Sequence, residues 1–281
     1  MNRNGIVRCM RYTTRRNVLR LLRVMVFLAV AGVGIAITVA TDRGRFVWSY
    51  TRQATLATLL SPRDPALRFE IGNYYFGGGA YDTERAEQYF REALAQNPYL
   101  QGPHYQLARI YFVTGNFNDA LEEINTEIKL NPEYGRSHYV RGLIYGYTGK
   151  LALAEEEFKA FLVWKKDSWA GNNDLAWIYF QEGKYALARD TARRGLEISP
   201  DNPWLLNALG VALLNLDEKE EAEDVFIRAL SALVGVTEET WGEAYPGNDP
   251  RVYGSGLTQM RESIKANLEL LENGDTSKPS L

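Results

Sequence analysis

Apolar residues recur every three or four positions through most of the chain after residue 65, which is the spacing of a buried stripe on an α-helix. The stretch 104–114 has this pattern, and Gly115-Asn116 ends it because glycine adopts left-handed backbone angles at little cost. A second amphipathic stretch, 117–130, stops at Asn131-Pro132. The pattern predicts two antiparallel helices joined by a tight turn.

This helix pair repeats with a period of 34 residues. The positions that keep the period are Ala120, Ala154, Ala188 and Ala222; Gly115, Gly149 and Gly183; Tyr111, Tyr145 and Tyr179; and Ala108, Gly142, Ala176 and Gly210. Five units are expected, over residues 65–100, 101–134, 135–168, 169–202 and 203–236. Since no unit can bury its apolar face alone, we expect an all-α fold in which the units stack into one continuous solenoid.

The spacing and residue types of these units resemble the tetratricopeptide repeat. The Leu/Ile-Gly/Ala-x-x-Tyr part of its pattern is present as Ile71-Gly72 with Tyr75, Leu107-Ala108 with Tyr111, and Leu175-Ala176 with Tyr179. The Ala-x3-Phe part is present as Ala86 with Phe90, Ala154 with Phe158, and Ala222 with Phe226. The departures from the pattern are Arg141 for leucine, Lys166 and Val234 for prolines, and Asp217 for the turn glycine. The resemblance implies a right-handed superhelix whose concave groove, lined by the first helix of each pair, binds a peptide or a partner helix.

The same resemblance gives the exposed positions of the first helices, which are the expected partner-binding residues. They are Phe69, Asn73, Phe76, Tyr105, Arg109, Phe112, Arg136, Tyr139, Leu143, Tyr147, Asn173, Trp177, Phe180, Trp204, Asn207 and Val211. Aromatic residues dominate this set, and some of them are expected to serve instead as core between adjacent first helices. The arginines suit a carboxylate, but the carboxylate clamp of chaperone-binding relatives is mostly absent.

After the fifth unit, residues 237–256 are rich in turn formers and predict a loop. Helical periodicity returns over 257–273, which we interpret as a capping helix for the last repeat, with a frayed tail over 274–281. An alternative is that the loop folds into the groove and occludes it.

The N-terminal segment is different in character. An uncharged apolar run, residues 24–41, follows a tip over 1–23 that holds seven arginines and no acid. As a helix the run is about 27 Å long, against roughly 30 Å of bilayer hydrocarbon. These features predict a transmembrane helix with a cytoplasmic N-terminus, a juxtamembrane helix or linker over 42–64, and repeats outside the cytoplasm. A cleaved export signal and a buried soluble helix stay open as alternatives.

Charge and composition refine this picture. The chain of 281 residues has a net charge of −3, which conceals a basic tip on a body with 25 basic and 35 acidic residues. A body of that charge argues against nucleic-acid binding. A single cysteine, Cys9, excludes an internal disulfide.

Candidate chemistry is sparse. The two histidines, His104 and His138, lie 34 apart at equivalent repeat positions, so a structural role is favoured over metal binding. Gly77-Gly78-Gly79 lacks the following Lys-Ser/Thr of a phosphate-binding loop. We therefore expect no enzyme activity, no cofactor, no metal and no small-molecule substrate.

The sequence thus predicts a non-enzymatic, membrane-anchored scaffold of bacterial type that binds a peptide or helix of a partner protein, for example in the assembly of an envelope complex. Two alternatives are a regulator of a partner enzyme with an occludable groove, and an exported soluble protein released by signal cleavage.

Overall fold

The computed structural model describes residues 22–27, 43–77, 81–244 and 253–273, and all regular structure within these ranges is helical. The chain divides into two compact units, Met1–Ile71 and Gly72–Leu281. The boundary lies inside α3 (Pro65–Gly77). Each unit is therefore considered by itself.

In the first unit, a helical stretch over residues 43–51 and α2 (Ala54–Leu60) precede α3. Trp48 is fully buried. The Arg45 guanidinium donates two hydrogen bonds to the Asp64 carboxylate, at 2.7 and 2.9 Å, and Asp64 also accepts from the Leu67 backbone N–H. A buried tryptophan and a bidentate ion pair make this segment a packed helical element.

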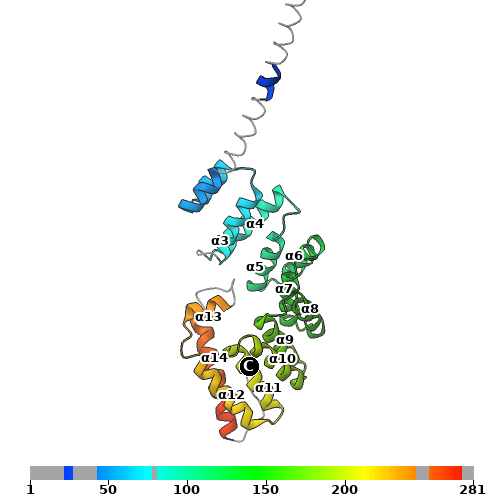
Figure 1. Ribbon diagram of the computed structural model, residues 1–281, viewed down its shortest axis with the longest axis vertical. Coiled ribbons are helices and arrows are strands. Elements are labelled where there is room, and N and C mark those ends of the chain that lie inside the picture. The colour runs from blue at the N-terminus through cyan, green and yellow to red at the C-terminus, as the bar shows by residue number, and fades with distance from the viewer. Residues whose placement is uncertain (1–21, 28–42, 78–80, 245–252, 274–281) are drawn as a thin grey trace, which may run out of the picture. The chain divides into compact units, whose positions relative to one another are not determined.

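The second unit consists of antiparallel helix pairs that stack in chain order (Figure 1). Its helices are α4 (Thr83–Gln96), α5 (Pro103–Val113), α6 (Phe117–Leu130), α7 (Arg136–Tyr147), α8 (Leu151–Trp164), α9 (Trp169–Gln181), α10 (Tyr185–Ile198), α11 (Pro203–Asn215), α12 (Lys219–Ala232), α13 (Glu238–Ala244) and α14 (Tyr253–Glu272). The first helices of successive pairs contact one another, as α5 with α7, α7 with α9, and α9 with α11. The predicted all-helical solenoid is confirmed.

The turns inside four of the pairs, α5–α6, α7–α8, α9–α10 and α11–α12, share one geometry that explains the glycine period. Gly115, Gly149 and Gly183 have φ angles of +80, +74 and +71°, and Asp217 takes the next turn with φ of 63°. The residue after each glycine donates its backbone N–H to the carbonyl five residues before it, as Asn116 does to Tyr111 at 2.7 Å. Left-handed backbone angles at this point are nearly free for glycine and costly for other residues.

The core of a pair depends on a small residue facing a phenylalanine. A Cβ atom added to Gly72, Gly142 or Gly210 would lie 2.5, 3.0 or 2.6 Å from the ring of Phe90, Phe158 or Phe226, respectively. All three rings are fully buried. Small residues therefore allow the two helices of a pair to approach closely around one ring.

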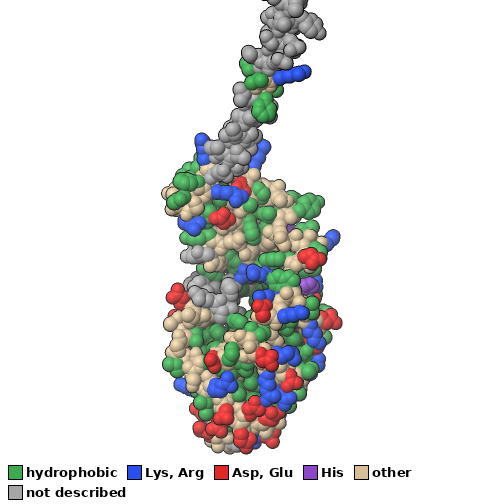
Figure 2. All heavy atoms as spheres, viewed as in Figure 1, with side chains coloured by type: hydrophobic (Ala, Val, Ile, Leu, Met, Phe, Trp, Pro, Cys, Tyr) green, Lys and Arg blue, Asp and Glu red, His purple; other side chains and the backbone are tan. Residues whose placement is uncertain are grey.

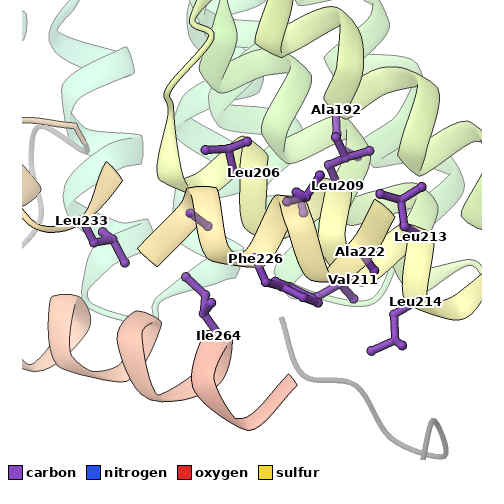
Figure 3. Packing of buried hydrophobic residues seen from close by; sticks show 14 of the residues in the cluster. Ala192, Leu206, Leu209, Val211, Leu213, Leu214, Ala222, Phe226, Leu233 and Ile264 are labelled. Carbon is purple, nitrogen blue, oxygen red and sulfur yellow. The ribbon is translucent and has the colours of Figure 1, made fainter. Parts of the chain in front are cut away.

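The C-terminal helix α14 packs on α12 and closes the apolar core. Ile264 is fully buried with Phe226 and Leu233 (Figure 3). Where a loop is expected, residues 237–256 include the short helix α13, because Thr237 accepts a hydrogen bond from the Thr240 N–H and two glutamates occupy the first turn.

The predicted transmembrane helix, 24–41, lies mostly outside the described residues. Residues 22–27, of which 24–27 belong to that run, are helical, and these six residues span about 9 Å at 1.5 Å per residue. Among the described residues there is no helix long and apolar enough to cross a bilayer. The prediction of a single-pass membrane protein with extracytoplasmic repeats is contradicted by this finding and is withdrawn.

Candidate functional site

The first helices of the second unit line a cavity of about 1070 Å³, which is the candidate site. Helices α5, α7, α9 and α11 supply most of its wall. The predicted groove residues that line it are Tyr105, Arg109, Phe112, Arg136, Tyr139, Leu143, Tyr147, Asn173, Trp177, Trp204 and Asn207. Residues that are far apart in sequence thus meet at one surface.

The other predicted groove residues are not among those that line the cavity. Phe76 is 1 % exposed and lies under the Arg109 guanidinium, 4.9 Å from its ring centroid. Asn73 accepts a hydrogen bond from Gln106. Phe180 packs against the apolar core, Val211 is fully buried in it, and Phe69 belongs to the first unit.

Cationic side chains lie at the α5 side of the cavity. Arg109 donates to the Gln106 side-chain oxygen at 2.7 Å and stacks on the Tyr105 ring at 5.7 Å. Burial raises the pKa of the Tyr105 hydroxyl, and the positive charges of Arg109 and Arg136 partly oppose that rise. Arg136 is exposed at the first turn of α7. The two arginines therefore create a positive potential around Tyr105, suited to a carboxylate.

Aromatic rings form the middle of the wall. Tyr147 contacts Phe112 edge-on at 5.2 Å and Trp177 at 5.7 Å, and it is 63 % exposed. Trp177 reaches this position because Gly146 has no side chain; a Cβ there would lie 2.8 Å from the indole ring. These rings offer a large apolar surface that costs little conformational entropy to present.

A row of three tryptophans continues the wall toward the C-terminal helices. Trp169 stacks on Trp204 at 5.6 Å, and Trp204 stacks on Trp241 at 4.6 Å. Trp241 comes from α13, and Met260 of α14 also lines the cavity. The segment after the last repeat thus borders the site.

One carboxyl group lies in the cavity wall among these rings. Asp174 of α9 is 8 % exposed and accepts a hydrogen bond from the Tyr139 hydroxyl at 2.5 Å and from Asn173 at 3.2 Å. Burial raises the pKa of Asp174 to about 6, although both hydrogen bonds lower it. Burial and the negative charge of Asp174 also raise the pKa of Tyr147. The carboxylate is therefore costly to ionise where it stands.

Several cavity residues were not predicted. They are Gln106, Val113, Tyr134, Val140, Phe161, Trp164, Lys165, Ser168, Trp169, Ala170, Asp174, Ala208, Trp241 and Met260. A signal was available for Asp174, because the period places it where the neighbouring repeats have Val140 and Ala208. Trp241 and Met260 follow the last repeat, so no period could place them.

The histidines lie outside the cavity and join the two helices of their pairs. His104 Nδ1 is 2.6 Å from a Glu123 carboxylate oxygen, and His138 Nδ1 is 2.8 Å from that of Glu157. Across the ranges that the structure describes, no three ligand-type side chains cluster as a metal site would need. Their equivalent contacts indicate a structural role.

Comparison with known proteins agrees with this architecture. The model of the family described as tetratricopeptide repeat matches residues 79–142 and 149–235. No curated protein matches the chain.

Solved structures share the fold at low identity. PilW, titled a widely conserved type IV pilus biogenesis factor, has a TM-score of 0.57 and 16 % identity, with 75 % of this chain and 93 % of that chain covered. MamA from Desulfovibrio magneticus RS-1 has a TM-score of 0.54 and 17 % identity, with 60 % of this chain and 94 % of that chain covered. YrrB, described as a tetratricopeptide repeat (TPR) protein with an unusual peptide-binding site, has a TM-score of 0.52 and 16 % identity, with 63 % of this chain and 91 % of that chain covered. At this identity the likeness concerns the fold alone.

Proposed function

The chain belongs to the tetratricopeptide repeat family, and we propose that it is a non-enzymatic scaffold that binds a peptide or helix of a partner protein in the cavity lined by α5, α7, α9 and α11. The aromatic wall of this cavity is the observation that carries the proposal. Its volume of about 1070 Å³ is at the upper end of small-ligand pockets, and the structure leaves Tyr147 and Trp164 63 % and 47 % exposed.

Aromatic residues in such a trough act as binding hot spots. Tyr147, Trp177 and Trp204 each offer a large rigid surface, and burial of such rings contributes much of the affinity of peptide complexes. Arg136, at the rim, steers and orients a partner more than it strengthens binding. An extended peptide or an amphipathic helix matches this combination.

Catalysis has little support in the cavity lining. A catalytic site needs a nucleophile or an acid and base within hydrogen-bond reach of a reacting group. Among the described residues the cavity lining includes one carboxyl group, Asp174, whose hydrogen-bond partners are Tyr139 and Asn173. Neither partner is a base at neutral pH, which favours a binding role.

The structural relatives support the same class of function. YrrB is described as having an unusual peptide-binding site, and PilW as a type IV pilus biogenesis factor. We extend this to a role for the present chain in assembling a larger protein complex.

The proposal is tested with peptides selected on the full chain from a random display library. Binding of a selected fluorescent peptide is measured by anisotropy for wild type and for the double variant Tyr147→Ala, Arg136→Glu. Loss of a hot-spot ring and reversal of a rim charge should weaken binding at least tenfold.

The matched control is Tyr99→Ala, Lys129→Glu, which removes a 77 % exposed ring and reverses an exposed charge outside the cavity. Equal loss in both double variants would place the binding site elsewhere.

The second candidate is a regulator of a partner enzyme whose groove is occludable. Trp241 favours it, because α13 places this ring against Trp204 at the cavity wall. Movement of α13 would then change the space available to a partner. Trp241→Ala should raise peptide affinity in this case and lower it if Trp241 is a contact residue.

A further inference from the structure

Asp174 is a carboxyl group at a buried position of α9. The equivalent residues one period away are Val140 and Ala208, which are apolar and, like Asp174, are buried in the cavity wall. Two periods away the equivalent residue is Gln106, which is polar and partly buried, so the repeat itself does not require a carboxyl group at this position. A carboxylate at such a position loses its hydration and gains nothing from packing.

No ion pair compensates the carboxylate within the described part of the chain. Its hydrogen-bond donors are the Tyr139 hydroxyl and the Asn173 amide, both neutral. The cations that line the same cavity have other neighbours: Arg109 and Arg136 lie near Tyr105, and Lys165 pairs with Asp167 at 2.8 Å. The negative charge of Asp174 is thus unbalanced.

Aromatic rings surround this charge. Tyr139 contacts Asp174 directly, and Tyr147 is close enough for the carboxylate charge to raise its pKa. Trp177 lies one helical turn after Asp174 on the same face of α9 and contacts Tyr147. Tyrosine and tryptophan faces attract cations through their π-electrons, most strongly when water is excluded.

A second polar atom in the cavity wall has no partner. Asn207 of α11 is 1 % exposed, and its side-chain oxygen accepts no hydrogen bond within the described residues. An unsatisfied buried acceptor is costly, and a donor from a bound molecule would satisfy it. This observation is independent of Asp174 and indicates a ligand that carries N–H groups.

We propose that Asp174 and the rings of Tyr139, Tyr147 and Trp177 form a subsite for the basic side chain of a lysine or arginine in the bound peptide. A guanidinium or ammonium group supplies the positive charge that the carboxylate lacks, several N–H donors, and a flat or compact cation for the rings. The inference rests on the proposed function and deepens it by naming one residue class of the partner.

The charges along the cavity also predict how a bound peptide is oriented. Positive side chains gather around Tyr105 on α5, and the one carboxylate among the described lining residues lies on α9. A peptide with a carboxylate toward α5 and a basic residue at α9 matches both ends. Charge complementarity therefore identifies a basic side chain rather than a neutral one at Asp174.

The test uses the full chain and two isosteric probes, N-acetyl-arginine-N-methylamide and the neutral N-acetyl-citrulline-N-methylamide. Their affinities are measured by ligand-observed NMR titration for wild type, Asp174→Asn and the control Asp201→Asn, which neutralises an exposed carboxylate in a turn outside the cavity. We expect wild type and the control to bind the arginine probe at least fivefold more tightly than the citrulline probe, and Asp174→Asn to bind the two equally.

A pH series on the unaltered chain covers the event that the variant does not fold. The groups that face Asp174 are Tyr139 and Tyr147 from α7 and Asn173 from its own helix, and phenols and amides ordinarily do not change charge between pH 5 and 7.5. Arginine preference should therefore decline toward pH 5, while citrulline binding stays constant.

Equal affinities of wild type for the two probes, or a preference that survives Asp174→Asn, would overturn the inference. Binding of selected peptides in the cavity would still uphold the proposed function in that case. Conversely, an arginine preference that wild type shows and Asp174→Asn loses, together with selected peptides that ignore the cavity variants, would uphold a site for basic groups at Asp174 and overturn peptide binding in the cavity.

Discussion

Asp174 shows how one residue departs from what the repeat alone requires. At the equivalent position the neighbouring repeats have Val140 and Ala208, and the repeat before them has Gln106, so none of these repeats has a carboxyl group there. The structure buries Asp174 and gives it two neutral hydrogen-bond donors, which do not offset the lost hydration. A residue that lowers stability in the wall of a candidate binding site is typical of a functional position.

The unfavourable burial of the Asp174 carboxylate predicts that the stability of the fold depends on pH. The pKa of Asp174 is about 6 in the folded chain against 3.8 in a model peptide, so the folded state binds the proton more tightly. Stability due to this group is therefore highest below about pH 4 and falls as the pH rises through 6. Asp174→Asn, which keeps an acceptor for Tyr139, should raise the free energy of unfolding by about 1–3 kcal/mol at pH 8 and change it little at pH 4.

Urea unfolding at the two pH values measures this difference, with Asp201→Asn as the exposed control. A destabilised Asp174→Asn at pH 8, or an effect of equal size at both pH values, would show that the carboxylate is not strained by burial.

For single residues, the sequence predicted which helix face lines the cavity better than it predicted which side chains on that face are buried. Most predicted groove positions lie in the cavity wall, because a helix face follows from periodicity. Phe76 and Phe180 pack into the core instead, since the depth of a ring depends on the residues of the adjacent helix. Trp164 reaches the cavity only because Gly135, at the start of α7, leaves room for its indole ring.

Among the elements, the turn within each helix pair is the most regular feature. Its backbone enters the left-handed region at Gly115, Gly149, Gly183 and Asp217. No atom lies within 4 Å of a Cβ added to any of the three glycines, so space does not dictate the residue there. Backbone conformation alone selects glycine at this position.

Two substitutions one period apart test whether backbone conformation selects glycine in the turn, because they should change the free energy of unfolding in opposite directions. Gly183→Ala forces an L-residue into the left-handed region and should lower the free energy of unfolding by about 1 kcal/mol. Asp217→Gly relieves the same strain and should raise it by roughly half that amount, since aspartate tolerates this region better than alanine.

Gly77→Ala is the matched control for the turn substitutions, because Gly77 also has open space around it but ordinary backbone angles. Thermal unfolding of the three variants gives the comparison. A loss at Gly77 as large as that at Gly183 would refute the conformational explanation.

The short helix α13 is an element that the sequence did not predict. Seven residues carry too little periodicity to stand out among turn formers. Its packing on α14 depends on two glycines, because a Cβ on Gly254 or Gly256 would lie 2.5 Å from Glu238 or 2.7 Å from Trp241. The Gly254-Ser255-Gly256 sequence therefore serves helix contact.

For the molecule as a whole, the repeated units share one core that must be closed at its end. The last repeat buries Phe226 and Leu233 against Ile264 of α14 (Figure 3). Acidic side chains gather at the end of this unit where α12 and α14 lie (Figure 2). Glu220, Glu221 and Glu223 are exposed near the start of α12, where negative charges interact favourably with the positive end of the helix dipole.

This closure predicts a large effect from one substitution. Ile264→Ala removes buried methyl groups from the fully buried contact with α12 and should lower the free energy of unfolding by about 2–4 kcal/mol. Lys265→Ala, the exposed neighbour on the same helix, should change it by less than about 0.5 kcal/mol. Chemical unfolding followed by circular dichroism measures both, and equal small effects would mean that α14 does not cap the array.

The architecture was predictable at this scale because a period that recurs in phase constrains every unit at once. The membrane prediction is contradicted because none of the described helices is both long and apolar enough to cross a bilayer, and the 20-residue helix α14 carries charged residues.

The central claim is that the aromatic cavity of the second unit binds a peptide. The most direct measurement is the affinity of a library-selected peptide for the full chain with Tyr147→Ala and Arg136→Glu, relative to Tyr99→Ala and Lys129→Glu. We expect the Kd to rise at least tenfold for the first pair and to change less than twofold for the second. Equal affinities for the two double variants would contradict it.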